Sequence, residues 1–182
     1  MNVRPLAGLF GLLAFSALLF SFDASAVRWS NNFVEFELPT HWKCFLEGAE
    51  WVCQHEDEAR GRDAIIILAA KLKGRQDTLD EYLKYLKKPK YYESVKGTPV
   101  KSTPKWAKMG KYNQHPWVDS MHLESEIPGF YTRYLATVKN DIAVLVTYSV
   151  NQSKYKLYRT QFESMVKTCL LYTSPSPRDL DL

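Results

Sequence analysis

The chain has 182 residues, of which 46% are hydrophobic, 14% aromatic and 24% charged. This composition excludes collagen-like, fully disordered and polytopic membrane proteins, and the aromatic content indicates a packed core. The formal net charge of +4 permits affinity for anionic surfaces but falls short of the strongly basic balance of nucleic-acid-binding domains. We therefore expect one globular domain and no nucleic-acid partner.

Residues 1–26 have the pattern of a secretory signal peptide. Arg4 precedes an apolar stretch from Leu6 to Phe22, and the segment ends in Ala24-Ser25-Ala26, a small-residue motif that signal peptidase accepts. Cleavage after Ala26 leaves a chain without a transmembrane span, in the periplasm or outside the cell. An uncleaved membrane anchor is the alternative, because the apolar stretch lies near the lower length limit for crossing a bilayer.

The first element expected after the signal peptide is a strand over residues 32–39. Val34, Phe36 and Leu38 alternate with polar side chains, which indicates a strand buried on one face. Pro39 ends this strand because proline cannot donate a backbone hydrogen bond.

A disulfide-linked hairpin is predicted over residues 42–53. Gly48-Ala49 suits a two-residue type II′ turn, and pairing outward from this turn places Cys44 directly opposite Cys53. The two cysteines fall at a non-hydrogen-bonded position, where the Cα atoms are close enough for a disulfide bond. Oxidation is favoured in an exported protein. A structural staple is the main interpretation, and a redox switch is the alternative.

The run from Ala64 to Ala70 is apolar and rich in isoleucine, which indicates a central strand buried on both faces. Such a strand needs a cover on each side of the sheet. Thr78-Leu79-Asp80-Glu81 is a capping box, and the helix that begins there is expected to end before Pro89. This helix supplies one cover.

The second half of the chain is predicted to consist of hairpins and a final helix. Residues 91–104 contain two prolines and a glycine, so we expect a loop with at most one edge strand. The two hairpins that follow are predicted over residues 105–112 with 117–125, and 131–138 with 142–150.

A C-terminal amphipathic helix is predicted to begin at Ser153 as its N-cap. Tyr155, Tyr158, Phe162 and Met165 lie on one stripe of this helix, which supplies the second cover of the sheet. The order of the elements predicts an α+β fold in which an antiparallel β-sheet is flanked by helices.

Residues 169–182 are set apart from the predicted domain. The eleven residues from Cys169 to Asp179 resemble the conceptual translation of a sequencing-library adapter. We therefore expect a single domain over residues 27–168, followed by an adapter-derived tail that carries no information about fold or function. A genuine flexible tail rich in serine and proline is the alternative.

The element order also carries a resemblance to a known family. With the strand and turn Phe36-Glu37-Leu38-Pro39-Thr40-His41-Trp42 and the final helix segment Phe162-Glu163-Ser164-Met165-Val166, the chain resembles the PsbP-like α/β/α sandwich. That family includes an extrinsic subunit of the photosynthetic oxygen-evolving complex, a Ran-GTPase-binding protein and uncharacterised bacterial envelope proteins. The resemblance implies a binding or assembly factor without catalytic motifs, and it carries over no particular binding residue.

We find no residue pattern that predicts catalysis, a cofactor or a metal site. The nucleophile, zinc, phosphate-loop and dinucleotide motifs do not occur in the sequence. His115, Asp119 and His122 form a possible cluster, but Asp119 and His122 are three residues apart on a strand and should face opposite sides of the sheet. His55, opposite Trp42 in the hairpin register, is expected to be an edge residue rather than a catalytic base.

A lysine-rich region over residues 84–111 is the candidate binding surface. This region contains nine lysines and only one acidic residue, and aromatic residues lie between the lysines in the sequence. The residues assigned to this surface are Lys84, Lys87, Lys88, Lys90, Tyr91, Tyr92, Lys105, Trp106 and Lys108. An anionic envelope component or an acidic protein would suit this chemistry. The alternative is that the lysines only keep a helix end and a loop soluble.

These patterns predict an exported, non-catalytic binding or assembly factor of the cell envelope, in which Cys44 and Cys53 form a disulfide. Two alternatives are kept. One is an enzyme whose active site is assembled without a linear motif, and the other is a redox-responsive envelope protein. The sequence does not predict the oligomeric state.

Overall fold

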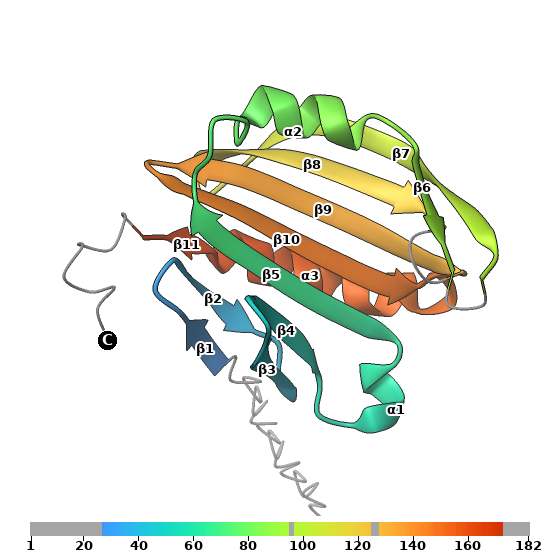
Figure 1. Ribbon diagram of the computed structural model, residues 1–182. Coiled ribbons are helices and arrows are strands. Elements are labelled where there is room, and N and C mark those ends of the chain that lie inside the picture. The colour runs from blue at the N-terminus through green and yellow to red at the C-terminus, as the bar shows by residue number, and fades with distance from the viewer. Residues whose placement is uncertain (1–26, 95–96, 125–127, 173–182) are drawn as a thin grey trace, which may run out of the picture.

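The computed structural model describes residues 27–94, 97–124 and 128–172. An eight-stranded antiparallel sheet, the main sheet, dominates the structure, in the order β3-β4-β5-β10-β9-β8-β7-β6 (Figure 1). Its strands are β3 (Trp42–Glu47), β4 (Glu50–His55), β5 (Ala64–Leu72), β6 (Lys90–Glu93), β7 (Pro99–Tyr112), β8 (His115–Leu123), β9 (Phe130–Lys139) and β10 (Ile142–Asn151).

Two helices lie on opposite faces of the main sheet. Helix α2 (Leu79–Leu86) covers one face and helix α3 (Tyr155–Thr168) lies on the other (Figure 1). The short helix α1 (Glu58–Gly61) lies between β4 and β5, and the 3₁₀ turn η1 (Gln152–Lys154) precedes α3. The predicted α+β class, an antiparallel sheet flanked by helices, is confirmed.

A second, smaller sheet lies on the α3 side and was not predicted. It contains β1 (Val27–Ser30), β2 (Val34–Leu38) and β11 (Leu170–Leu171) in the order β1-β2-β11. The expected alternation in β2 is present, because Val34, Phe36 and Leu38 are all buried. However, β2 packs beside α3 instead of joining the main sheet, so a helix and a small sheet together cover this face.

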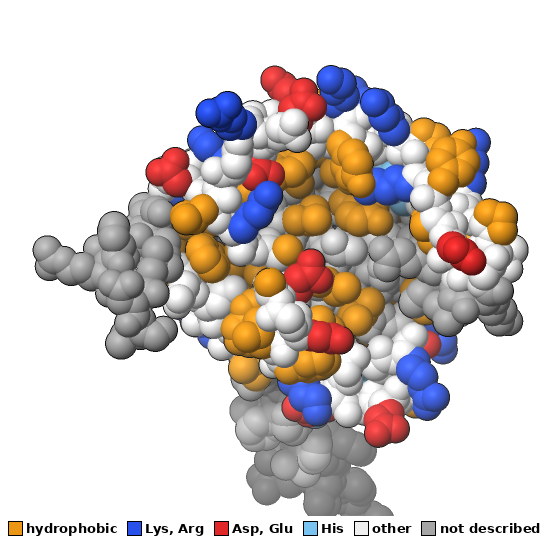
Figure 2. Space-filling view, viewed as in Figure 1, with side chains coloured by type: hydrophobic (Ala, Val, Ile, Leu, Met, Phe, Trp, Pro, Cys, Tyr) orange, Lys and Arg blue, Asp and Glu red, His pale blue; other side chains and the backbone are white. Residues whose placement is uncertain are grey.

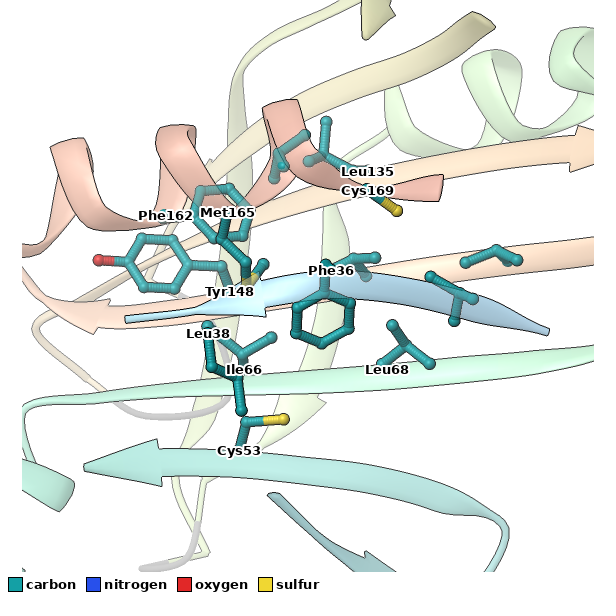
Figure 3. Packing of buried hydrophobic residues seen from close by; sticks show 14 of the residues in the cluster. Phe36, Leu38, Cys53, Ile66, Leu68, Leu135, Tyr148, Phe162, Met165 and Cys169 are labelled. Carbon is teal, nitrogen blue, oxygen red and sulfur yellow. The ribbon is translucent and has the colours of Figure 1, made fainter. Parts of the chain in front are cut away.

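The principal core lies between the main sheet, β2 and α3 (Figure 3). Phe36 from β2 and Tyr148 from β10 are both buried there, and the ring of Tyr148 stacks on that of Phe162 from α3 at 4.3 Å. Tyr158 and Met165 complete the buried stripe of α3. Full burial of side chains of this size contributes roughly 1.5–3 kcal/mol each, so this stripe anchors α3 to the sheet.

The predicted hairpin and its disulfide are confirmed. The register pairs Cys44 with Cys53 and Trp42 with His55, and the disulfide joins Cα atoms that are 4.0 Å apart. Gly48, the first residue of the turn, has a φ of 61°, as a type II′ turn requires. The bond therefore ties β3, an edge strand of the main sheet, to its neighbour β4.

The predicted capping box is also confirmed, but the helix covers less of the sheet than expected. The Thr78 hydroxyl accepts a hydrogen bond from the Glu81 backbone N–H at 3.2 Å. Leu86 packs on Val118 of β8 and Ala136 of β9, at a distance from β5 in the sheet order. Strand β5 is central as predicted, yet its outward-facing Ile65 is only half-buried, so the expectation of burial on both faces is corrected.

Hydrophobic side chains consequently gather on the uncovered half of this face, between α2 and the hairpin of β3 and β4 (Figure 2). The register places Ile67 of β5, which is half-buried, and Phe45 of β3, of which 39% is exposed, on this face of the sheet. Helix α2 is eight residues long and packs mainly on β7, β8 and β9, with Leu145 of β10 at the border of its cluster.

The loop predicted over residues 91–104 is wrong for most of its length. Strand β6 pairs with the first residues of β7, which begins at Pro99. Pro104 is followed by a register shift between it and Trp106. Prolines are tolerated at the start of a strand and at bulges near a sheet edge, so this segment forms strands despite its composition.

The start of the last helix is also corrected. Ser153 does not act as the N-cap of α3, because its backbone N–H donates to the Asn151 side chain at 2.9 Å within the preceding 3₁₀ turn. Helix α3 begins at Tyr155, and its N-cap residue, Lys154, makes no side-chain capping bond. The 3₁₀ turn continues the strand-to-helix connection for three residues before the α-helical pattern starts.

The structure describes only part of the two predicted end segments, residues 1–26 and 169–182. The predicted signal peptide, residues 1–26, lies outside the described residues, and so do residues 173–182. Residues 169–172 are described and belong to the fold: Cys169 is buried, β11 pairs with β2, and the Tyr172 backbone N–H donates to the Phe33 carbonyl at 2.9 Å. The adapter origin of the tail stays a prediction. Among the described residues, no helix has the length and hydropathy needed to cross a membrane.

Candidate binding cleft

A cleft of about 710 Å³ opens on the α3 side of the main sheet, between β7, β8 and β9 and the first turns of α3. We call it the β7–α3 cleft. Residues of all four elements line it: Lys105, Trp106, Lys108, Met109, Lys111 and Tyr112 of β7, Asp119 and Met121 of β8, Tyr131 and Arg133 of β9, and Tyr155, Arg159 and Glu163 of α3.

A buried ion pair lies at the floor of the cleft. The Arg133 guanidinium donates to both carboxylate oxygens of Asp119, from Nε at 2.9 Å and from Nη2 at 2.8 Å. Nη2 also donates to the Tyr112 hydroxyl at 2.7 Å, and that hydroxyl donates to Asp119 at 3.1 Å. Glu163 of α3 lies 3.4 Å from Nη1. The network therefore joins three strands of the sheet to the helix.

The network fixes the protonation states of the groups at the floor of the cleft. Burial opposes the charged form of Arg133, but its hydrogen bonds and ion pair with Asp119 dominate and raise its pKa above the ordinary value. Burial raises the pKa of Tyr112 to about 12, so its hydroxyl keeps its proton. The floor thus contains a permanently paired arginine and a neutral phenol at physiological pH.

Unpaired positive charge gathers instead at the rim. Arg133 is matched by Asp119, and Arg159 is matched by Glu163, whose Oε1 lies 3.0 Å from its Nε. Lys105 and Lys108 of β7 are exposed, and the described residues place no carboxylate within ion-pair distance of them. These two lysines, the rim lysines, make the mouth of the cleft positive, whereas Lys111, three residues beyond Lys108 on the strand, is directed toward the α2 side.

Aromatic rings line the wall beside the rim lysines. Tyr131 and Tyr155 pack edge to face with centroids 5.2 Å apart, and the Lys105 ammonium lies 4.8 Å from the centre of the Tyr131 ring. The Nε1 atom of Trp106 is buried and has no hydrogen-bond acceptor among the described residues. An anion bound by the rim lysines would therefore lie against flat, largely apolar walls.

The structure divides the lysine-rich region that the sequence predicts as one surface. Lys84, Lys87, Lys88 and Lys90 lie on or just after α2, on the opposite face from Lys105, Trp106 and Lys108. Lysines and arginines are visible around α2 in Figure 2. The Lys90 ammonium lies 4.0 Å from the Tyr85 ring centre, so it packs against the helix. The predicted single surface is corrected to two, separated by the sheet.

Tyr91 and Tyr92 of β6 lie at the outer edge between these two faces. Tyr91 is exposed, with the Lys101 ammonium 5.7 Å from its ring centre. Tyr92 donates its hydroxyl proton to the Glu124 carbonyl, which fixes its ring against the end of β8. Neither tyrosine lines the β7–α3 cleft.

The bulge in β7 decides which residues face the cleft. Before the register shift Pro104 pairs with His122, and after it Lys108 pairs with Asp119, whose side chain lies in the cleft. An uninterrupted register would have turned Trp106 and Lys108 toward α2, because a shift of one residue exchanges the two faces of a strand. A bulge of this kind leaves no clear pattern in the sequence.

Several cleft residues were not predicted as site residues, although two carried a usable signal. Arg133 occupies a core-facing position in a strand, two residues before the buried Leu135, and a buried arginine needs an acidic partner. Asp119 occupies the equivalent position in β8. The alternation of buried and exposed positions in β8 and β9 therefore contained a signal for the pairing of Arg133 with Asp119. The α3 contribution depends on how the helix crosses the sheet.

The possible histidine cluster is resolved by the sheet geometry. Asp119 points into the cleft, whereas His122 lies beneath α2, where its Nε2 is 3.0 Å from the Leu86 carbonyl. Burial lowers the pKa of His122, so its neutral form is favoured. His115 lies beside the Val138 carbonyl at 3.2 Å. The prediction that Asp119 and His122 face opposite sides is confirmed.

A second pocket of about 810 Å³ lies on the other flank of α3, beside α1 and the turn before β3. His41 and His55 face it with ring centroids 6.0 Å apart, and the His55 Nδ1 accepts a hydrogen bond from the Asp57 backbone N–H at 3.0 Å. Its lining combines Arg60 and Lys154 with acidic residues, so no one charge prevails there. It specifies a ligand less clearly than the β7–α3 cleft.

These features define an α/β/α sandwich of the PsbP-like fold. Among solved structures, the chain is similar to cyanobacterial PsbP (CyanoP) from Synechocystis sp. PCC 6803, with 14% sequence identity and a TM-score of 0.57, over 91% of this chain and 98% of that chain. LpqN of Mycobacterium tuberculosis, described as involved in cell envelope biogenesis, matches with 10% identity and a TM-score of 0.51, over 77% and 83%.

A third similar structure is the Ran-binding protein Mog1p of Saccharomyces cerevisiae, with 10% identity and a TM-score of 0.50, over 81% of this chain and 96% of that chain. At these identities the likeness establishes the fold alone. No family model matches the chain, and no curated protein matches its sequence.

Proposed function

We propose that this protein is an exported, non-catalytic binding or assembly factor of the cell envelope that holds an anionic ligand in the β7–α3 cleft. The observation that carries the proposal is the pair of rim lysines, which have no acidic partner among the described residues and lie beside an aromatic wall. A ligand of negative charge is the simplest partner for these lysines.

Export is supported by the disulfide and by one structural neighbour. The bond between Cys44 and Cys53 would persist in an oxidising compartment and is unusual in a reducing cytosol. One structural neighbour is described as involved in cell envelope biogenesis, and another as a Ran-binding protein. Both descriptions fit a binding or assembly role. The signal-peptide pattern of residues 1–26 supplies the route of export.

The chemistry of the cleft suits an anionic envelope component. Its volume of about 710 Å³ lies within the roughly 300–1,000 Å³ of pockets that bind small molecules, so it has room for one segment of a larger anionic chain. Lysine ammonium groups attract charge without fixing its geometry, whereas arginine would favour planar, bidentate recognition. Two exposed ammonium groups along one strand suit repeating phosphates or carboxylates.

Anion binding should be measured on three defined probes: inorganic polyphosphate, poly-L-glutamate, and vesicles containing phosphatidylglycerol. We expect the Lys105→Glu/Lys108→Glu variant to bind the preferred probe about tenfold more weakly or worse, because attraction becomes repulsion at each site. The preferred probe distinguishes a phosphate polymer, an acidic polypeptide and a lipid surface. Binding should weaken as salt is added.

A matched variant on the opposite face provides the control. Lys87→Glu/Lys88→Glu changes the net charge by the same amount but lies on the α2 side of the sheet. We expect it to retain binding within about threefold of the unmodified protein, since screening limits its effect at that distance. Equal losses of binding in both variants would show that the attraction depends on net charge and not on the cleft. Failure of the unmodified protein to bind any probe would overturn the proposed function.

A further inference from the structure

The main sheet ends at β3 on one side, and within the described ranges no strand pairs with its outer edge (Figure 1). In a two-residue hairpin, residues alternate between hydrogen-bonded and non-hydrogen-bonded pairs. Glu47 and Glu50 flank the turn as a hydrogen-bonded pair. Cys44 and Leu46 therefore direct their backbone N–H and C=O groups away from β4. An edge of this kind is a template for another strand.

The side chains on one face of β3 carry a symmetric charge pattern. Lys43, Phe45 and Glu47 alternate along this face, so opposite charges flank an aromatic ring. Lys43 and Glu47 are exposed, and Phe45 is exposed by 39%. Among the described residues, neither charge has an ion-pair partner.

Glu47 also faces a like charge within its own hairpin. Its register partner is Glu50, which is exposed as well, and like charges directly opposite on neighbouring strands are destabilising. The described residues place no cation within ion-pair distance of either carboxylate. A lysine arriving from outside would convert this repulsion into attraction.

We propose that two copies of this chain associate by pairing their β3 strands antiparallel, about a two-fold axis that passes between the two Phe45 side chains. In this register, Cys44 of each copy exchanges backbone hydrogen bonds with Leu46 of the other. Lys43 of each copy lies across from Glu47 of the other, beside Glu50. The two main sheets continue into one another through the shared edge.

The charges select this register among those that the backbone allows. Only residues with outward-directed backbone groups can exchange bonds, so the register changes in steps of two residues. A step in one direction places Lys43 across from Phe45, and a step in the other places Glu47 across from Phe45. Either step loses both ion pairs. Two-fold symmetry makes every favourable contact occur twice.

The association is expected to be reversible. Stable dimers usually bury about 1,200–2,000 Å² in total, and one pair of short strands buries less than that. Strand β3 has six residues. We therefore expect a monomer–dimer equilibrium that depends on protein concentration and weakens with added salt, because its ion pairs are exposed.

Analytical ultracentrifugation of the purified, disulfide-bonded protein tests the proposal with charge reversals. Lys43→Glu and Glu47→Lys should each weaken dimerisation about tenfold or more, because each places like charges opposite one another twice. The double variant Lys43→Glu/Glu47→Lys should recover the original dissociation constant within about threefold, since the pairs are restored with their signs exchanged. Lys73→Glu, an exposed lysine beyond the end of β5, serves as the matched control.

Mixing the two single variants gives a second readout. The Lys43→Glu chain and the Glu47→Lys chain should associate with one another more tightly than either does with itself, because both cross-pairs are then attractive. Native mass spectrometry distinguishes this heterodimer from homodimers. A protein that stays monomeric at every concentration overturns the proposal. A dimer that tolerates both single reversals, or responds equally to Lys73→Glu, overturns it as well.

Discussion

Arg133 is buried at the floor of the β7–α3 cleft, although an unpaired guanidinium would be costly to remove from water. Asp119 engages it through two hydrogen bonds, and Tyr112 and Glu163 occupy further directions around it. Such a network contributes less to stability than its contacts suggest, because both charges lose hydration. Its stronger effect is on geometry, since it holds β7, β8 and β9 against α3.

Removing one partner of this buried pair should destabilise the protein. Asp119→Ala leaves Arg133 charged and largely desolvated, and breaking a buried pair in this way typically costs about 3–5 kcal/mol. Because the cleft admits water, we expect a loss near the lower end, about 3 kcal/mol, in the free energy of unfolding measured with urea. Asp119→Ala/Arg133→Leu should recover most of the loss.

Lys108→Ala is the control for this measurement. Lys108 lies directly opposite Asp119 in the register, but its side chain is exposed. We expect a change within about 0.5 kcal/mol, as for most surface substitutions. A loss below about 1 kcal/mol for Asp119→Ala would contradict the structural role assigned to the pair.

At the level of elements, the hairpin of β3 and β4 depends on its disulfide. Replacing both cysteines, Cys44→Ser/Cys53→Ser, frees the chain between them in the unfolded state. In the chain-entropy description, a loop of about ten residues corresponds to a loss of roughly 2–3 kcal/mol. Urea unfolding of the variant should show this loss, and the unmodified protein with its disulfide reduced should show a similar one. An unchanged unfolding midpoint would contradict the staple interpretation.

Helix α2 is held to β5 by one carboxylate. Asp77 accepts hydrogen bonds from the Tyr82 hydroxyl at 2.6 Å, the Gly74 N–H at 2.7 Å and the Lys71 ammonium at 2.9 Å. The Tyr82 hydroxyl, followed by the other two groups, lowers the pKa of Asp77 from 3.8 to about 2. The ionised carboxylate therefore stabilises the turn that leads into α2.

The sign of this shift predicts a pH dependence. Because the pKa of Asp77 is lower in the folded state than in the unfolded state, its ionised carboxylate stabilises the fold above pH 4. This contribution is lost as the pH falls toward 2. We expect Asp77→Asn to destabilise the protein by about 1–2 kcal/mol at neutral pH, because charge-assisted hydrogen bonds are lost. The difference from the unmodified protein should shrink between pH 4 and pH 2. A difference independent of pH would contradict the assignment.

Across the whole molecule, sequence patterns predict those features that depend on neighbouring residues. The turn at Gly48 and the capping box at Thr78 are local, so the hairpin register and the helix start follow directly. The placement of β2 on α3 depends on contacts between distant segments. The same is true of the cleft, whose ion pair joins Asp119 to Arg133 across two strands and whose rim is set by a bulge after Pro104.

The segment after α3 shows the same dependence on distant contacts and leads to a prediction about the intact fold. Cys169 is buried in the principal core, and burial raises the pKa of its thiol to about 12. The Asn113 side chain donates to the Cys169 carbonyl at 2.7 Å, and the Lys139 ammonium donates to the Leu171 carbonyl at 3.0 Å. Whatever its origin, this segment closes one end of the core.

A chain that ends at Thr168 should therefore be less stable than one that ends at Tyr172. The shorter chain loses β11 and the buried Cys169 side chain, and it leaves part of the core beside β2 exposed to water. Removing a buried side chain with its hydrogen bonds typically costs about 2–4 kcal/mol. Urea unfolding of the two chains measures this difference. Equal stabilities would show that residues 169–172 add nothing to the fold, because α3 and β2 would then close the core without them.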